Sequence, residues 1–250
     1  MKTLAIRPDP GGVVPETAMV MAAGLGKRMR PLTATRPKPL VEVGGKPLID
    51  YVFDRLRAAG VKRAVVNVHY LADAMEAHLV HRVKGIDVIV SDERDALLET
   101  GGGIVKARAE IGDSPFLVVN SDNLWLDGPT DAIRALAARW DDETMDALLL
   151  VVPLARAHCH GGQGDFRLDA EGKIVGRRLP GKPAPFVYTG VQILHPRVIR
   201  DWPEGPFSTN LFWERAIAAQ RAWGLVHQGL WFDVGTPAAV GEAEAILADG

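Results

Sequence analysis

Between residues 19 and 152, short apolar runs alternate with amphipathic stretches, and this alternation leaves the chain few possible folds. The runs have the length of buried strands, and the stretches between them carry apolar residues at helical spacing. We predict strands at Met19–Ala23, Ala64–Val68, Ile86–Val90, Phe116–Val119 and Leu148–Val152, and helices at Leu48–Ala59, Leu71–Val80, Gly103–Ile111 and Ala132–Trp140. Gly60 is a suitable C-cap for the first helix, and Thr100 a suitable cap for the third. Strands separated by helices predict an α/β fold, a doubly wound and mostly parallel sheet covered on both faces.

After Pro153 the pattern changes to a smaller, β-rich portion. Asp165–Leu168 and Lys173–Arg178 flank a turn-forming tetrapeptide and predict a hairpin. Further along we predict a strand at Phe186–Leu194, a helix at Leu211–Trp223, a strand at Leu225–Phe232 and a closing helix at Pro237–Leu247. Residues 1–17 are rich in proline and glycine, and we expect a flexible N-terminal extension followed by one domain over residues 18–250.

Composition excludes several kinds of partner. The chain is 47% apolar and 24% charged, with a net charge of −2, so it has no basic surplus for nucleic acid. No apolar stretch is long enough to span a membrane, and residues 1–17 lack the apolar core of a signal peptide, so we expect a cytoplasmic protein. Cys159 is the only cysteine, and with His158 and His160 alone it cannot complete a zinc site, so we expect an ordinary loop there.

A glycine turn, Gly24-Leu25-Gly26, follows the first predicted strand. Lys27 and Arg28 come next, and Lys38 stands between two prolines. Glycines let backbone N–H groups approach an anion, and nearby cations complete a seat for phosphate. The P-loop pattern fails here because Met21 and Arg28 occupy its first glycine and its Ser/Thr position, and the dinucleotide pattern fails at its third glycine. From spacing alone, both a phosphate loop and an ordinary strand-to-helix turn remain open.

The surrounding residues resemble the opening motif of the sugar-phosphate nucleotidyltransferases. The matching positions are Ala22-Ala23-Gly24, Gly26, Arg28-Met29, Pro31-Leu32-Thr33, Pro37-Lys38-Pro39-Leu40, Gly45 and Pro47. The resemblance continues through Asn120-Ser121-Asp122 and Trp231–Thr236 and covers nearly the whole chain from residue 18. It implies a Rossmann-like fold in which residues 18–152 mainly bind nucleotide and residues 153–250 mainly bind a sugar phosphate.

The same resemblance assigns catalytic roles. It implies that Asp122 and Asp233, each expected at a strand end, hold one Mg²⁺, a cation that prefers carboxylates, phosphate oxygens and water. Arg28 would hold the β- and γ-phosphates, and Lys38 would bridge the two reacting phosphates. Taken singly, an aspartate after a strand is commonly a turn residue and a lysine is commonly solvated, so these roles depend on the resemblance.

The binding residues follow from the same resemblance. For the nucleotide we expect Ala22, Ala23, Gly24, Gly26, Glu93, Gly101, Gly102 and Asn120; for the acceptor sugar we expect Glu99, Asp165, Thr189 and Gly190. Glycine turns and capping residues need no ligand, so a purely structural role stays open at each. Two departures from the family pattern are Ser121 in place of glycine and a loop over Ser91–Leu98 that is one residue longer, which leaves the alignment of Glu93 open.

Three sequence segments narrow the range of expected substrates. Leu98–Ile104, Gly164–Leu168 and Trp231–Pro237 resemble short members of the family that uridylylate N-acetylmuramate 1-phosphate during cell-wall peptidoglycan recycling. The expected partners are therefore UTP and that sugar phosphate, acting with Mg²⁺ in a monomer or small homo-oligomer. Guanylyl, thymidylyl or cytidylyl transfer to mannose, glucose or heptose 1-phosphate remains an alternative. A non-catalytic nucleotide-sugar sensor is the alternative from a different class, but all four expected catalytic residues are present.

Overall fold

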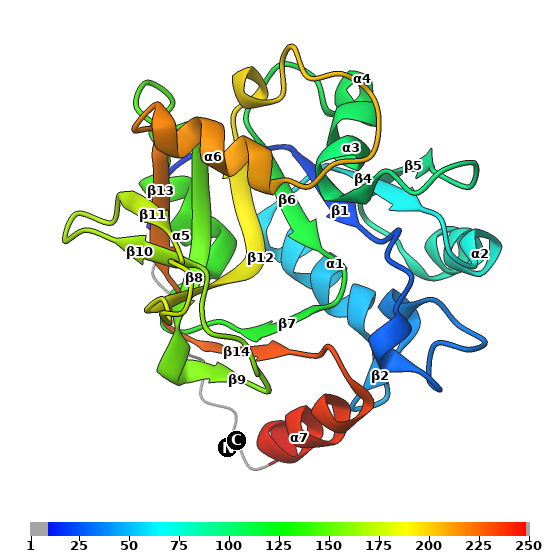
Figure 1. Ribbon diagram of the computed structural model, residues 1–250. Coiled ribbons are helices and arrows are strands. Elements are labelled where there is room, and N and C mark those ends of the chain that lie inside the picture. The colour runs from blue at the N-terminus through cyan, green and yellow to red at the C-terminus, as the bar shows by residue number, and fades with distance from the viewer. Residues whose placement is uncertain (1–9, 249–250) are drawn as a thin grey trace.

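The computed structural model describes residues 10–248, and a large mixed sheet organises this part of the chain (Figure 1). Its strands are β1 (Thr17–Met21), β4 (Arg63–Val68), β5 (Asp87–Asp92), β6 (Phe116–Asn120), β8 (Ala147–Pro153), β10 (Phe166–Leu168), β11 (Ile174–Arg177), β12 (Phe186–Leu194) and β13 (Ala222–Val226). The order is β11-β10-β12-β6-β1-β4-β5, and β8 pairs with both β12 and β13. Since β12 pairs antiparallel with β6, β8 and β10, only β12 and β11 run against the common strand direction.

Helices cover both faces of this sheet. They are α1 (Leu48–Ala59), α2 (Ala72–Arg82), α3 (Glu99–Lys106), α4 (Arg108–Ile111), α5 (Ala132–Arg139) and α6 (Asn210–Ala218). Successive strand residues point to opposite faces, so Val20 and Val66 pack with α1, α2 and α5, whereas Met19 and Val65 pack with α3, α4 and α6. Strands buried on both faces explain the continuous apolar runs in the sequence.

A smaller three-stranded ribbon lies beside the main sheet. It comprises β7 (Asn123–Leu126), β14 (Leu230–Asp233) and β9 (Ala157–His158), with β14 in the middle. The closing helix α7 (Pro237–Ala248) and the hairpin of β2 (Glu42–Val43) and β3 (Lys46–Pro47) pack near it, around Leu124 and Phe232. The short 3₁₀ turns are η1 (Lys27–Met29), η2 (Lys38–Leu40), η3 (Leu154–Arg156) and η4 (Pro196–Val198).

An ion cluster around the buried Asp146 ties the start of β8 to the elements that follow it. Asp146, just before β8, accepts hydrogen bonds from Arg197 and from Arg221, the latter at 2.7 Å. Burial raises the pKa of the Asp146 carboxyl, but hydrogen bonds from Arg221 and Arg197 outweigh it and leave the pKa below its ordinary value. The cluster fixes the start of β8 against the segment that leads into β13.

The structure confirms the doubly wound α/β class and most predicted elements, including α1 with Gly60 as its cap and the strand Phe186–Leu194. Three predictions were wrong. The helix expected at Leu211–Trp223 ends at Ala218, and the strand expected at Leu225–Phe232 is split between β13 and β14 in different sheets. The helix expected from Gly103 begins at Glu99 instead, so Thr100 lies within its first turn and does not cap it.

The N-terminal extension expected over residues 1–17 lies partly outside the described residues. Within residues 10–17, Pro15 is buried, Val14 packs on the core, and Thr17 already belongs to β1. Among residues 10–248, no helix is both long and apolar enough to cross a membrane.

Candidate functional site

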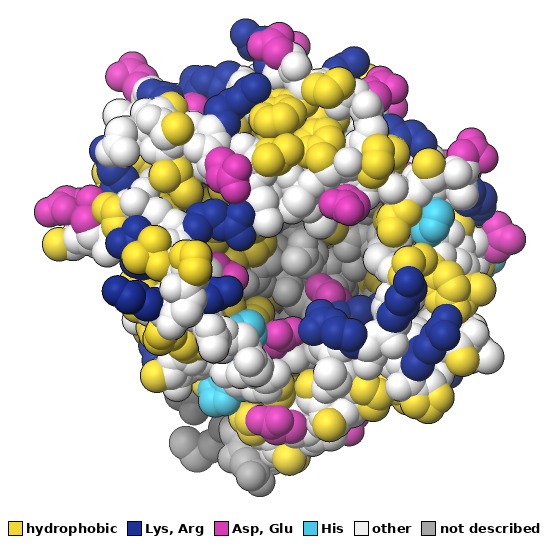
Figure 2. All heavy atoms as spheres, in the orientation of Figure 1, with side chains coloured by type: hydrophobic (Ala, Val, Ile, Leu, Met, Phe, Trp, Pro, Cys, Tyr) yellow, Lys and Arg dark blue, Asp and Glu magenta, His cyan; other side chains and the backbone are white. Residues whose placement is uncertain are grey.

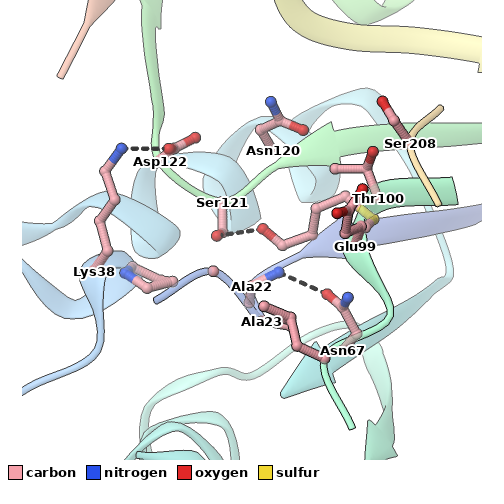
Figure 3. A pocket seen from close by; sticks show the side chains of 14 residues that line it. Ala22, Ala23, Lys38, Asn67, Glu99, Thr100, Asn120, Ser121, Asp122 and Ser208 are labelled. Atoms are coloured by element: carbon pink, nitrogen blue, oxygen red, sulfur yellow. Dashed lines mark hydrogen bonds and ion pairs between the residues drawn. The ribbon is translucent and has the colours of Figure 1, made fainter. Parts of the chain in front are cut away.

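The carboxyl ends of β1, β4 and β6 meet at one level, because Met21 is in register with both Asn67 and Asn120. Beyond these ends lies a cavity of 430 Å³, in the position where ligands bind in open α/β sheets (Figure 3). Its lining is Met21, Ala22, Ala23, Gly24, Lys38, Pro39, Asn67, Leu97, Glu99, Thr100, Asn120, Ser121, Asp122 and Ser208. The same face of the molecule is hollowed at its centre, and Lys and Arg side chains gather at one edge of the hollow (Figure 2).

Lys38 and Asp122 meet across this cavity. Lys38 Nζ lies 2.5 Å from Asp122 Oδ2, and only 13% of the lysine side chain is exposed (Figure 3). Ser121, one residue earlier, donates its hydroxyl to the carbonyl of Met21 at 2.6 Å and so ties the end of β6 to the end of β1. The structure therefore holds a largely shielded cation and a carboxylate at the cavity wall, as a site for phosphates and a metal would require.

The glycine turn shapes the adjacent wall. Gly26 has a φ of 58°, and a Cβ there would lie 3.0 Å from the Thr33 side chain and 3.1 Å from Lys38 Cβ. Gly24 lines the cavity, and a Cβ on it would have no other atom within 4 Å, so its backbone faces open space. Gly26 thus permits the close approach of the turn to Lys38, and Gly24 leaves room for a ligand.

A buried polar relay stands behind the turn. Asn67 Oδ1 accepts from Ala22 N at 2.7 Å, and Asn67 Nδ2 donates to Glu93 Oε1 at 2.8 Å. Glu93 Oε2 in turn accepts from Leu98 N at 3.2 Å. Asn67 and Glu93 are each 1% exposed, so Glu93 supports the cavity wall from behind and does not itself line the cavity.

The start of α3 forms the opposite wall. Glu99, with a φ of 57°, and Thr100 line the cavity. Gly101 and Gly102 lie deeper, and both donate their N–H groups to the carbonyl of Phe207, at 2.7 and 3.1 Å. Here glycine serves close packing against the 205–207 segment, so the structure gives these two residues a role other than the base contact that we expected.

A second recess of 420 Å³ contains the other two predicted catalytic residues. It is lined by Arg28, Cys159, His160, Gly161, Gly162, Asp233, Gly235 and Thr236. Gly235 lies beside both Asp233 and Arg28, since a Cβ on it would lie 3.1 Å from Asp233 Oδ1 and 3.4 Å from Arg28 Nη1. His160 Nδ1 lies 2.9 Å from Asp233 Oδ2.

Strand register brings the two aspartates to one end of the ribbon. β7 and β14 are antiparallel with Asn123 opposite Asp233, so Asp122, one residue before Asn123, belongs to the same end. Within residues 10–248, no group of three or more His, Cys, Asp or Glu side chains is placed to hold a metal ion. Two carboxylates fit a cation that takes its remaining ligands from phosphate and water, and Asp122 is paired here with the Lys38 ammonium.

Three of the four predicted acceptor residues lie around β12, and the fourth, Glu99, lies at the start of α3. Asp165 Oδ2 accepts from Tyr188 N at 2.9 Å, which fixes the carboxylate against the strand. Gly190 has a φ of 84° at a register shift in β12, and a Cβ there would lie 2.2 Å from Asn123 Nδ2. Thr189 is fully buried and donates its hydroxyl to Leu150 O at 2.9 Å, so the structure turns its side chain inward and does not offer it to a sugar.

Two residues of the site were missed from the sequence. Asn67 is the last-but-one residue of the predicted strand Ala64–Val68, and a polar residue inside an apolar run near the carboxyl end of a strand was the signal that could have found it. His160 was assigned to an ordinary loop with Cys159. Burial, then the charges of Glu242 and Asp233, raise the pKa of the Cys159 thiol to about 11, so it is protonated at pH 7 and unsuited to act as a nucleophile.

Comparison with known proteins identifies the family of the chain. A family described as "Nucleotidyl transferase" matches residues 17–250, and the chain belongs to that family. A Caulobacter vibrioides protein named N-acetylmuramate alpha-1-phosphate uridylyltransferase is 49% identical over 94% of this chain and 98% of that protein. The protein of the same name from Neisseria meningitidis serogroup B is 36% identical, over 92% of this chain and 97% of its own length. The chain is accordingly a nucleotidyltransferase.

Solved structures support the fold. A UTP-bound UGPase from Acinetobacter baumannii superposes with a TM-score of 0.76 at 19% identity, covering 93% of each chain. This likeness confirms the α/β architecture expected from the sequence.

Proposed function

We propose that this protein transfers UMP from UTP to N-acetylmuramate 1-phosphate, giving UDP-N-acetylmuramate and pyrophosphate in peptidoglycan recycling. The observation that carries the proposal is the 49% identity, along nearly the full length of both chains, to a protein named for that reaction. The Lys38–Asp122 pair at the sheet edge and the Arg28–Asp233 recess beside it supply the groups that such a transfer needs. Because the donor is a nucleoside triphosphate, the reaction belongs in the cytoplasm.

The reaction needs no general base. An oxygen of the sugar phosphate attacks the α-phosphorus of UTP, the bond from that phosphorus to the β-phosphate oxygen breaks, and pyrophosphate leaves with the electron pair. A phosphate monoester carries between one and two negative charges at pH 7, so the nucleophile is already ionised. Catalysis then consists of positioning and of charge neutralisation.

Each role falls to a residue already placed in the fold. Lys38 offsets the repulsion between the acceptor phosphate and the α-phosphate, and Arg28 binds two oxygens of the departing pyrophosphate with its planar fork. Asp122 and Asp233 would hold Mg²⁺, which neutralises phosphate charge and orients the triphosphate when it is bound. The turn at Ala22-Ala23-Gly24 and the side chain of Asn120 would contact the nucleotide.

The acceptor would lie on the β12 side of the cleft. Asp165, held by Tyr188 N, and the backbone at Gly190 would meet the sugar, with Glu99 at the α3 wall. Ala22 offers its carbonyl to the base, because its N–H is already bonded to Asn67.

A pyrophosphate-release assay tests the proposal. Purified protein, Mg²⁺ and N-acetylmuramate 1-phosphate are combined with UTP, dTTP, GTP or CTP in turn, and N-acetylglucosamine 1-phosphate serves as the matched acceptor lacking the lactyl group. Release with UTP and the muramate alone is the expected result, and Asp122→Asn should abolish it while far-UV circular dichroism stays unchanged. Release with another nucleotide or only with another sugar phosphate would refute the assignment of substrate, and full activity of Asp122→Asn would refute the catalytic role of Asp122.

A further inference from the structure

The histidine at the second recess is held in one orientation. His160 Nδ1 lies 2.9 Å from Asp233 Oδ2, and only 15% of the histidine side chain is exposed. Its ring lies against Trp231, with centroids 5.9 Å apart, and Gly162 passes so close that a Cβ there would lie 2.4 Å from His160 Nε2. A ring confined on these two sides keeps Nδ1 directed at the carboxylate.

The backbone is bent to place it there. β9 pairs in parallel with β14, with Phe232 opposite His158, and this pairing brings the next residues alongside Asp233. Cys159 follows with a φ of 60°, a left-handed conformation that non-glycine residues rarely adopt. The turn at Cys159 redirects the chain so that His160 faces the end of β14.

We propose that His160 is a positioning residue, which holds Asp233 in the orientation that binds the divalent cation. A carboxylate can only accept, so Nδ1 carries the proton and donates it to Oδ2. This bond leaves Oδ1, the oxygen beside Gly235, for the cation. The inference rests on the proposed function to the extent that Asp233 is taken as a metal ligand.

The expected size of the effect comes from other metal sites. Carboxylate ligands are themselves hydrogen-bonded, and removal of such a partner weakens metal affinity by about 10- to 100-fold. The competing view is that His160 only packs on Trp231. Two variants distinguish these roles. His160→Phe keeps the ring contact with Trp231 without the hydrogen-bond donor, whereas His160→Asn keeps a donor nitrogen near the position of Nδ1 without the ring.

The test measures Mn²⁺ affinity of the full chain with saturating UTP and no acceptor, by electron paramagnetic resonance of the free ion. His160→Phe should bind Mn²⁺ about 10- to 100-fold more weakly, and His160→Asn should stay within about threefold of the unaltered protein. In turnover assays, His160→Phe should raise the Mg²⁺ concentration for half-maximal rate by a similar factor, with kcat at saturating Mg²⁺ within about threefold.

Asp233→Asn is the control that separates this inference from the proposed function. Loss of Mn²⁺ binding in Asp233→Asn with unaltered binding in His160→Phe would overturn the role of His160 and leave Asp233 as a ligand. Equal impairment of His160→Phe and His160→Asn would also overturn it, since the donor would then not be the cause. Unaltered binding in Asp233→Asn would overturn the metal assignment and the inference together, whatever the outcome of the pyrophosphate assay.

Discussion

One substitution in the buried relay of Asn67 and Glu93 should make the folding stability of the protein depend on pH. Asn67→Asp keeps an acceptor for Ala22 N but replaces the donor to Glu93 with a second carboxylate oxygen, at a contact of 2.8 Å. Two ionised carboxylates at that separation repel by about 6 kcal/mol at an effective dielectric constant near 20. The buried pair, with each native residue only 1% exposed, cannot relieve this repulsion by turning to solvent.

Protonation of one of the two carboxyls limits the destabilisation, because a neutral carboxyl does not repel the other. Keeping one carboxyl protonated costs about 1.4 kcal/mol for each pH unit above its ordinary pKa near 4, which is about 4 kcal/mol at pH 7. Because the folded-state pKa of one carboxyl is raised, no such cost is present below pH 4, and it grows as the pH rises toward the folded pKa. The stability of Asn67→Asp should therefore fall, relative to the unaltered protein, by about 1.4 kcal/mol per unit between pH 5 and pH 8.

Urea unfolding followed by tryptophan fluorescence at pH 5, 6, 7 and 8 measures this slope. The double variant Asn67→Asp/Glu93→Gln is the control, since its glutamine amide can donate to the new aspartate and still accept from Leu98 N. Its stability should return to within about 1 kcal/mol of the unaltered protein and lose the slope. A deficit in Asn67→Asp that is the same at every pH, or a double variant no better than the single one, would refute the reasoning.

Three further predictions concern single positions. Gly101→Ala places a Cβ 2.5 Å from Phe207 Cε2, so overpacking should cost about 1–3 kcal/mol, measured by urea unfolding; unchanged stability would contradict the packing role. Asp146→Asn removes the negative charge that two arginines share, which weakens both of their hydrogen bonds, and should cost about 2 kcal/mol at pH 7, by the same measurement. Since the pKa of Asp146 is depressed, that deficit should vanish as the pH falls below 4, and a constant deficit would show another cause. Gly235→Ala crowds Asp233 Oδ1 at 3.1 Å and should lower kcat/KM about 10-fold or more with little change in Tm, whereas an unchanged kcat/KM would mean that the recess tolerates the methyl group.

Local patterns predicted the elements whose residues pack within one layer. The helical stripe from Leu48 to Ala59 and the glycine after it predicted α1 with its observed bounds, because spacing and cap chemistry act within a few residues. The apolar run Leu225–Phe232 was wrongly predicted as one strand. Gly229 inside it indicated otherwise, because a Cβ there would lie 1.9 Å from Leu126 O, and at this close approach β13 ends before β14 begins.

In the candidate site, too, some residues could be predicted from local sequence and others could not. The glycine turn, Lys38 and Asp122 stand in a motif or at a strand end, and the sequence predicted that they would line a phosphate cleft. The approach of His160 to Asp233 spans 73 residues and depends on a two-residue strand and a left-handed cysteine. Neither leaves a periodic pattern, so the contact could be found only in three dimensions.

The register of the ribbon through β14 limits where the chain can be lengthened by protein engineering. Asp233 and His160 keep their places only while β14 and β9 hold their register, and a one-residue insertion in either strand would turn its following side chains to the opposite face. Residues 179–183, between β11 and β12, are exposed and belong to no strand. A loop of another length at residues 179–183 therefore leaves the register of β9 and β14 unchanged, and with it the contact between His160 and Asp233.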